Sequence, residues 1–118
     1  FLTMGTQSKK SESIVLRHGT DGAITLDYNV LRKAVLVLRA VNHKLRQSIV
    51  ALLEEQKRMT VTEIYVKLRL EQSVASQHLA ILRRAGVVNT ERQGKFIHYS
   101  LNYDRIAEIS QFIEDLTK

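Results

Sequence analysis

The sequence predicts a mainly helical fold with one small β-hairpin, in the order α-α-α-α-β-β-α. Three observations predict this fold. Apolar residues recur with a helical period over residues 27–85, the period changes to two after Gly86, and the helical period returns after Asn102. The chain has 118 residues, enough for one domain with a real core. We expect that domain over residues 27–118, preceded by a flexible or extended arm over residues 1–26.

The composition excludes several kinds of protein. Without cysteine the chain has no disulfides, no thiolate metal site and no cysteine nucleophile. No run of apolar residues is long enough to span a membrane. The formal net charge is +6. Residues 57–101 hold eight basic and three acidic side chains, and therefore most of that charge. A polyanion such as nucleic acid is the partner that this balance favours.

The N-terminal segment gives the weakest pattern. Residues 1–12 are rich in small polar residues and lack the apolar core of a signal peptide, so we expect a mobile tail. Residues 13–26 have two short apolar runs around Gly19 and Gly22, which suit either a small hairpin or an extended arm.

A first helix follows from Asp27 to about Val41, apolar on nearly every face. Such a helix must be covered on most sides, and a second subunit is a natural cover. Asn42 resembles the N-cap of a second helix over residues 43–56. That helix has a single apolar stripe: Leu45, Ile49, Leu52 and Leu53.

Two short helices around a tight turn come next, a helix-turn-helix. Thr60 and Glu63 form a predicted capping box at the start of the first of them. A turn over residues 69–71 leads to the second helix, residues 72–85, which ends at Gly86 in a left-handed conformation.

Residues 87–92 and 95–101 alternate like strands, with a hairpin turn at Gln93-Gly94. Asn102 then caps a last helix whose apolar stripe is Ile106, Ile109, Phe112, Ile113 and Leu116.

The outward face of the helix 72–85 is short and polar at its N-terminal end and basic at its C-terminal end. A helix that enters the major groove needs short side chains for close approach, amide and hydroxyl groups for base edges, and cations for phosphates. We expect base reading by Gln72, Ser73, Ser76 and Gln77. We expect backbone contacts from Arg69, Arg83, Arg84, Arg92 and Lys95, the last two at the hairpin tip. An ordinary solvated helix face and a hairpin kept soluble by charge are the alternatives.

Two segments resemble the ArsR/SmtB family of bacterial regulators. Residues 70–88, LEQSVASQHLAILRRAGVV, are similar to its recognition helix, and residues 92–101, RQGKFIHYSL, are similar to its wing. The resemblance implies a winged helix-turn-helix homodimer that binds a palindromic operator, usually as a repressor relieved by an effector. It also implies a dimer interface through the first and last helices, which here would use Leu31, Val35, Leu38, Ile109, Phe112, Ile113 and Leu116.

The departures from the family pattern argue against a metal sensor. Tyr65 and Lys67 stand where one branch has cysteines, and the last helix has Tyr103 and Arg105 but no histidine near the other family site. The four histidines, His18, His43, His78 and His98, form no i,i+4 pair. We therefore expect no metal and no cofactor.

Nothing in the sequence resembles a catalytic constellation, so we expect no enzyme. The predicted function is a cytoplasmic, DNA-binding transcriptional regulator that acts as a homodimer on double-stranded DNA. Its effector, if it has one, would be a small molecule or a protein. The alternative is a winged-helix protein-interaction module whose basic surface has no specific DNA target.

Overall fold

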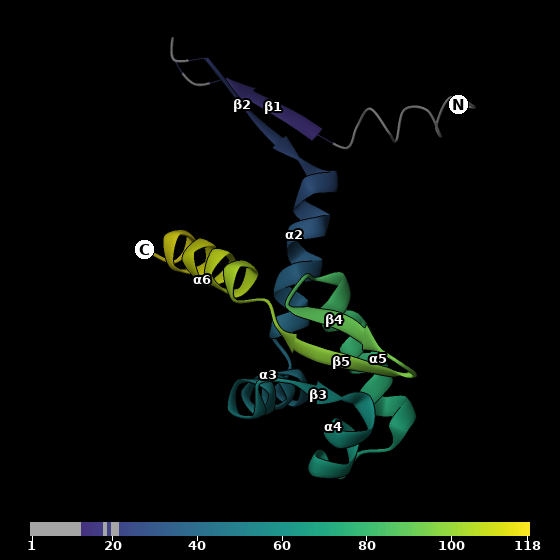
Figure 1. Ribbon diagram of the computed structural model, residues 1–118. Coiled ribbons are helices and arrows are strands. Elements are labelled where there is room, and N and C mark those ends of the chain that lie inside the picture. Colours follow the sequence, from purple (N-terminus) through teal and green to yellow (C-terminus); the bar gives the residue numbers. More distant parts are fainter. Residues whose placement is uncertain (1–12, 18, 20–21) are drawn as a thin grey trace, which may run out of the picture. The chain divides into compact units, whose positions relative to one another are not determined.

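The structure is a computed structural model that describes residues 13–17, 19 and 22–118. The expected tail over residues 1–12 and the side chain of His18 lie outside the described residues. Contacts divide the chain into two units, residues 1–37 and 38–118, which we describe separately. The first unit contains a hairpin and most of helix α2, and the second contains the remaining elements (Figure 1).

In the first unit, the described part of residues 13–26 forms two paired strands, so the small hairpin is confirmed over the extended arm. Strands β1 (Ser13–Arg17) and β2 (Ala23–Asp27) pair antiparallel. Their register places Ile14 opposite Leu26 and Leu16 opposite Ile24, and all four side chains are exposed. Helix α2 (Tyr28–Val41) follows directly, and the Asp27 carboxylate accepts the backbone N–H of Asn29 at 2.9 Å.

Helix α3 (Lys44–Gln56) starts one residue later than predicted. The sequence suggested Asn42 as its N-cap, and that prediction was wrong. His43 is the cap, because its Nδ1 atom accepts the backbone N–H of Leu45 at 3.1 Å. The Asn42 backbone N–H instead donates to the Leu38 carbonyl at 3.0 Å and ends α2.

Helices α4 (Val61–Leu68) and α5 (Gln72–Arg84) form the predicted helix-turn-helix. The capping box at the start of α4 is confirmed. The Glu63 N–H donates to the Thr60 hydroxyl at 3.2 Å, and the Thr60 N–H donates to the Glu63 carboxylate at 2.8 Å. Arg69 closes α4 in the left-handed region, at φ 58°, and Gly86 follows α5 at φ 81°.

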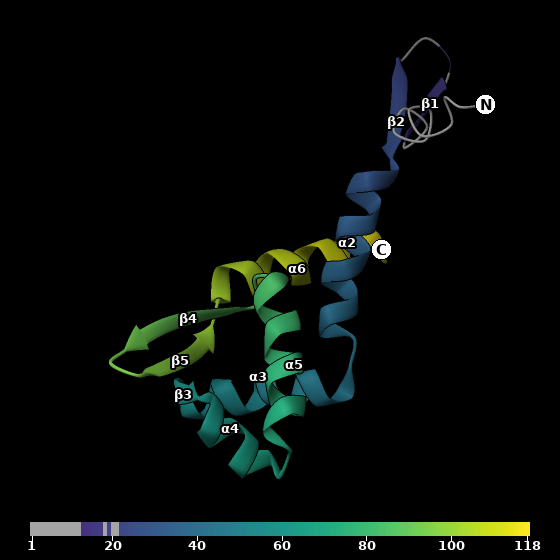
Figure 2. The ribbon, with the colours of Figure 1, turned by 90° about the vertical axis from the view of Figure 1, so that its right-hand side faces the viewer.

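Strands β4 (Val88–Gln93) and β5 (Phe96–Leu101) form the predicted hairpin and extend beyond the helices as a wing (Figure 2). Its turn is Gly94-Lys95, one residue later than predicted, because Gln93 still pairs with Phe96. A two-residue strand, β3 (Met59–Thr60), pairs with the other edge of β5 and was not predicted. The sheet order is therefore β3-β5-β4.

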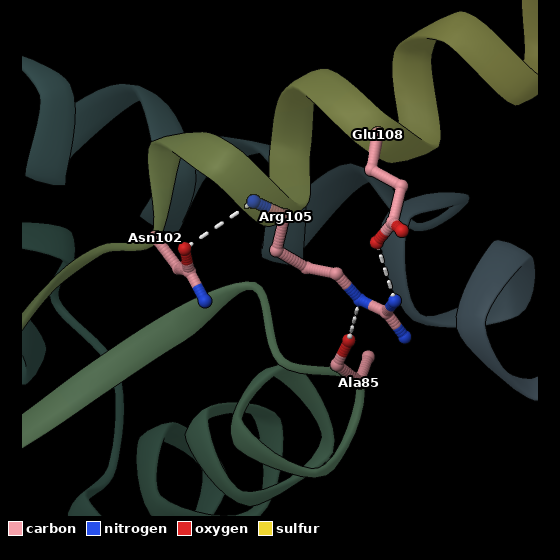
Figure 3. A network of polar contacts seen from close by, with 4 residues as sticks. All are labelled: Ala85, Asn102, Arg105 and Glu108. Carbon is pink, nitrogen blue, oxygen red and sulfur yellow. Dashed lines mark hydrogen bonds and ion pairs between the residues drawn. The ribbon is translucent and has the colours of Figure 1, made fainter.

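Helix α6 (Tyr103–Leu116) begins at Asn102, whose side chain accepts the Arg105 N–H at 3.2 Å, as the sequence predicts. Arg105 connects this helix to the end of α5. Its Nε donates to the Ala85 carbonyl at 3.0 Å, and its guanidinium also pairs with Glu108 at 2.8 Å (Figure 3). A cation near the last carbonyls of a helix satisfies unpaired acceptors and opposes the negative end of the helix dipole.

The core of the second unit lies among α3, α4, α5 and the sheet. Its largest fully buried side chains are Ile49, Leu53, Ile64, Leu79, Leu82 and Val87. The predicted winged helix-turn-helix order is confirmed, with β1, β2 and β3 as additions. No helix in the described ranges is both long enough and apolar enough to cross a membrane.

Substitution Thr60→Ala removes the hydroxyl acceptor from the capping box. We expect the free energy of unfolding, measured by urea denaturation, to fall by about 1 kcal/mol. Thr62→Ala is the matched control, because Thr62 is exposed on the same helix and takes no part in the box. Equal losses in the two variants would show that the box does not stabilise α4.

Candidate nucleic-acid interface

Helix α5 has one buried face and one exposed face. Ala75, Leu79 and Leu82 are fully buried, so the rotation of the helix about its axis is set by the core. The four side chains predicted to read bases are all exposed on the other face: Gln72, Ser73, Ser76 and Gln77. Arg83 and Arg84 are exposed in the last turn of the same helix. The structure thus confirms the division of faces that the sequence predicts.

The turn before α5 leaves the start of that helix open. The Leu70 N–H donates to the Tyr65 carbonyl at 2.9 Å and closes the turn after α4. Glu71 holds the N-cap position of α5, but its side chain makes no capping hydrogen bond. The first backbone N–H groups of a helix attract anions such as phosphate when no side chain occupies them.

The wing tip carries the two predicted cations. Arg92 is exposed, and its Nε donates to the Gly94 carbonyl at 3.3 Å, so its side chain lies across the turn. The Lys95 ammonium lies 5.8 Å from the centre of the exposed Phe96 ring. Gly94 has φ 63°, a conformation that glycine adopts without strain, and no atom lies within 4 Å of where its Cβ would be.

A groove of about 330 Å³ lies beside α5, lined by Ser76, Ala80, Arg83, Arg84 and Tyr99. It brings the two arginines of α5 next to strand β5. The sequence analysis placed Tyr99 in the wing segment but assigned it no contact, because its position in the groove depends on how the sheet packs against α5.

Two further basic side chains, Arg69 and Arg58, lie close to α5 or the wing in sequence, and Arg58 has an acidic partner. Arg69 is exposed at the left-handed C-cap of α4, at the turn before α5. Arg58, which directly precedes β3, forms an ion pair with Glu91 on β4 at 3.3 Å. The pair neutralises one basic side chain of the middle segment, and the predicted backbone contacts did not include it.

Helix α5 also carries His78, half-buried on its inner side. The Arg46 guanidinium on α3 lies 3.0 Å from His78 Nδ1, and the His43 ring lies 4.9 Å from the His78 ring. Burial, and then the proximity of His43 and of the Arg46 charge, lowers the pKa of His78 below its ordinary value. The sequence analysis missed Arg46, although it shares a helical face with Ile49 and Leu53.

The described residues contain no grouping of three His, Cys, Asp or Glu side chains that could hold a metal ion. At the two sites where some family members place ligands, this chain has other side chains with other surroundings. Lys67 is exposed on α4. The Tyr103 hydroxyl donates to the Glu54 carboxylate, and Arg105 donates to the Ala85 carbonyl.

Both helices predicted at the dimer interface have exposed apolar side chains. On α2, Leu31 and Val35 are exposed and Leu38 is half-buried. On α6, Phe112 is 46% exposed and Leu116 is 65% exposed. Among the seven predicted residues, Ile113 is also exposed, whereas Ile109 is buried within the protomer.

An apolar groove of about 290 Å³ lies between α3 and α6. Its lining is Val41, Arg46, Gln47, Val50, Val87, Ile106, Ile109, Ser110 and Ile113. Two residues of the predicted interface, Ile109 and Ile113, therefore line an open apolar concavity.

Known proteins share this fold and much of this sequence. Residues 43–90 match the profile of the family described as "Bacterial regulatory protein, arsR family". The transcriptional activator HlyU of Vibrio cholerae is 34% identical over 84 residues, which are 71% of this chain and 77% of that protein. The transcriptional repressor PagR of Bacillus anthracis is 33% identical over 91 residues, which are 77% of this chain and 91% of that protein.

Solved structures of transcriptional regulators have the same fold as this chain. The crystal structure of PagR superposes with a TM-score of 0.57 at 34% identity, covering 76% of this chain and 99% of that one. NolR from Sinorhizobium fredii gives a TM-score of 0.61 at 29% identity, covering 75% of this chain and 88% of that one. In each case the matched region spans more than three quarters of the relative's own length. This chain therefore belongs to the arsR family of bacterial regulatory proteins, which are DNA-binding transcriptional regulators and not enzymes.

Proposed function

We propose that this protein is a transcriptional repressor that binds a palindromic operator as a homodimer. Helix α5 enters the major groove, and the wing lies on the phosphate backbone or in the minor groove. One observation carries the proposal: a helix held by its buried face presents four exposed amide and hydroxyl side chains and then two exposed arginines. Such a regulator meets its DNA in the cytoplasm.

Sequence would be read by the N-terminal half of α5. Glutamine can bond the N6 and N7 edge of adenine with two hydrogen bonds, and serine can bond several base edges. The first two turns of α5 carry the four side chains predicted to read bases, and nothing in the described protomer covers them: Gln72, Ser73, Ser76 and Gln77. These side chains can contact bases only if the backbone of α5 comes close to the floor of the major groove. None of them is long enough to prevent that approach.

Affinity would come mainly from the cations around that half-helix. Arg83 and Arg84 flank the groove beside β5, Arg69 lies at the turn before α5, and Arg92 and Lys95 lie at the wing tip. Contacts of this kind release counterions from DNA, so affinity falls steeply with salt and carries little sequence information.

A two-fold dimer would supply the palindromic symmetry, because each protomer reads one half-site and the half-sites lie about one helical turn apart. The exposed apolar rows of α2 and α6 support this assembly, since a second copy removes them from water. We assign repression rather than activation because the relative PagR is named a repressor. The relative HlyU is named an activator, so the same fold also occurs in activators. An effector would be a small molecule or protein of unidentified chemistry.

The test is selection of bound duplexes from a random pool, followed by sequencing, with a mobility-shift assay at about 50 and about 200 mM salt. The proposal requires a palindromic consensus and binding that weakens at the higher salt. Absence of any shifted duplex at either salt would favour a protein-interaction module instead.

Gln77→Ala and Arg83→Ala separate base reading from backbone binding. Gln77→Ala should cost about 1–3 kcal/mol of binding to the selected duplex and little on scrambled DNA. Arg83→Ala should weaken binding to both duplexes alike and reduce the slope of log affinity against log salt by about one. The two binding curves for each variant provide the measurement. Equal behaviour of the two variants would refute the separate roles.

Phe112→Glu places a charge in the apolar row of α6. Because Phe112 is half exposed in the protomer, the variant should fold, but sedimentation velocity should show monomers and weaker binding to the palindrome. Ala107→Glu adds the same charge at another exposed position of α6, outside the apolar row, and should leave the dimer intact. A Phe112→Glu variant that remains dimeric would exclude α6 from the interface.

A further inference from the structure

Side chains of α3 donate hydrogen bonds to the last backbone carbonyls of α2. The carbonyl oxygens of Arg39 and Ala40 accept hydrogen bonds from Nη2 and Nε of Arg46, at 3.0 and 2.6 Å. The carbonyl of Val41 accepts one from Nε2 of Gln47 at 2.9 Å. The last carbonyls of a helix have no partner within the helix, so these bonds join the final turn of α2 rigidly to α3.

Arg46 also reaches the DNA-reading helix. Its Nη1 lies 3.0 Å from Nδ1 of His78, which follows it by 32 residues. A guanidinium has donors only, so Nδ1 must accept, and the imidazole must be neutral with its proton on Nε2. One side chain thus bonds the end of α2 and the middle of α5 at the same time.

Arg46 is 6% exposed and is the one buried charged side chain among the described residues. No carboxylate pairs with it in that part of the chain, so two carbonyls and one imidazole satisfy the guanidinium. A buried donor that loses its acceptor is strongly unfavourable. The arrangement can therefore persist only while His78 accepts.

We propose that Arg46 is a positioning residue that sets the orientation of α5 relative to the final turn of α2, and that neutral His78 is its required acceptor. The proposal rests on the proposed function, and it adds a condition to it. The core sets the rotation of α5 about its axis, and the Arg46–His78 bond fixes its place against α3; loss of that bond would displace Gln77, the neighbour of His78, from its base. Selective binding should then depend on the protonation of one histidine.

The surroundings of His78 set the direction of that dependence. The charged or titratable groups that the structure places against it are Arg46 on α3 and His43 at the N-cap of α3. Burial disfavours the imidazolium most, and the proximity of His43 and of the Arg46 charge disfavours it further, so the pKa of His78 lies below its ordinary value. His78 is then neutral at pH 7. Protonation on acidification replaces the acceptor by a donor and places a second positive charge beside Arg46.

The experiment compares three variants of the full chain with the wild type. His78→Asn keeps a side-chain acceptor near the place of Nδ1 and does not titrate. His78→Leu removes the acceptor at similar bulk. His43→Ser keeps an oxygen for the N-cap but removes the neighbouring imidazole. The measured quantity is the ratio of affinities for the selected duplex and its scrambled counterpart, from about pH 5 to about pH 8 at constant ionic strength.

We expect His78→Leu to lower this ratio about tenfold at neutral pH. The wild type and His43→Ser should lose selectivity on acidification, whereas His78→Asn should stay selective throughout. An unchanged ratio in His78→Leu, or an equal acid loss in His78→Asn, would overturn the inference. Circular dichroism establishes that each variant is folded, and the acid titration of the wild type tests the inference even if His78→Leu does not fold. A wild type without selectivity at any pH would instead overturn the proposed function, and this inference with it.

Discussion

The interface depends on the burial of one face of α5. Ala75, Leu79 and Leu82 are fully buried, and a helix cannot rotate about its axis without exposing such residues and opening cavities in the core. The rotation of α5 in turn decides which side chains face outward. The polar row from Gln72 to Gln77 is therefore presented by the core, although none of its members takes part in the core.

Apolar packing fixes the rotation, and polar bonds hold the helix to its neighbours. At mid-helix, His78 meets Arg46 of α3. At the C-terminal end, the Ala85 carbonyl accepts from Arg105 of α6, beside Gly86, where an added Cβ would lie 3.2 Å from Arg105 Nε (Figure 3). Hydrogen bonds to charged groups are directional and stronger than neutral ones. These two bonds join α5 to α3 at mid-helix and to α6 at its C-terminal end.

Local patterns in the sequence were sufficient for most of this fold. The Thr60–Glu63 capping box, the Asn102 cap and the exposed row of α5 each depend on residues a few positions apart, so periodicity and capping chemistry predict them. The cap of α3 was misplaced because Asn42 and His43 can both accept, and a histidine cap is less usual.

The features that sequence could not predict depend on contacts between distant residues. Strand β3 has two residues and exists only because β5 offers an edge to pair with. Tyr99 enters the groove beside α5 through sheet packing, and Arg46 occupies a position that a helical pattern would give to an apolar residue. A buried arginine is stable only where acceptors surround its guanidinium. Here the acceptors are two carbonyls of α2 and an imidazole of α5, so the site joins three helices.

The most direct measurement of the central claim is an amide-resolved NMR titration of the protein with the duplex that it selects. The account predicts that the largest changes in chemical shift fall on the exposed face of α5 around Gln72–Gln77 and on the wing tip around Gly94, at a stoichiometry of two chains per duplex. Changes confined to α6 or to the β1–β2 hairpin, with α5 unaffected, would contradict it.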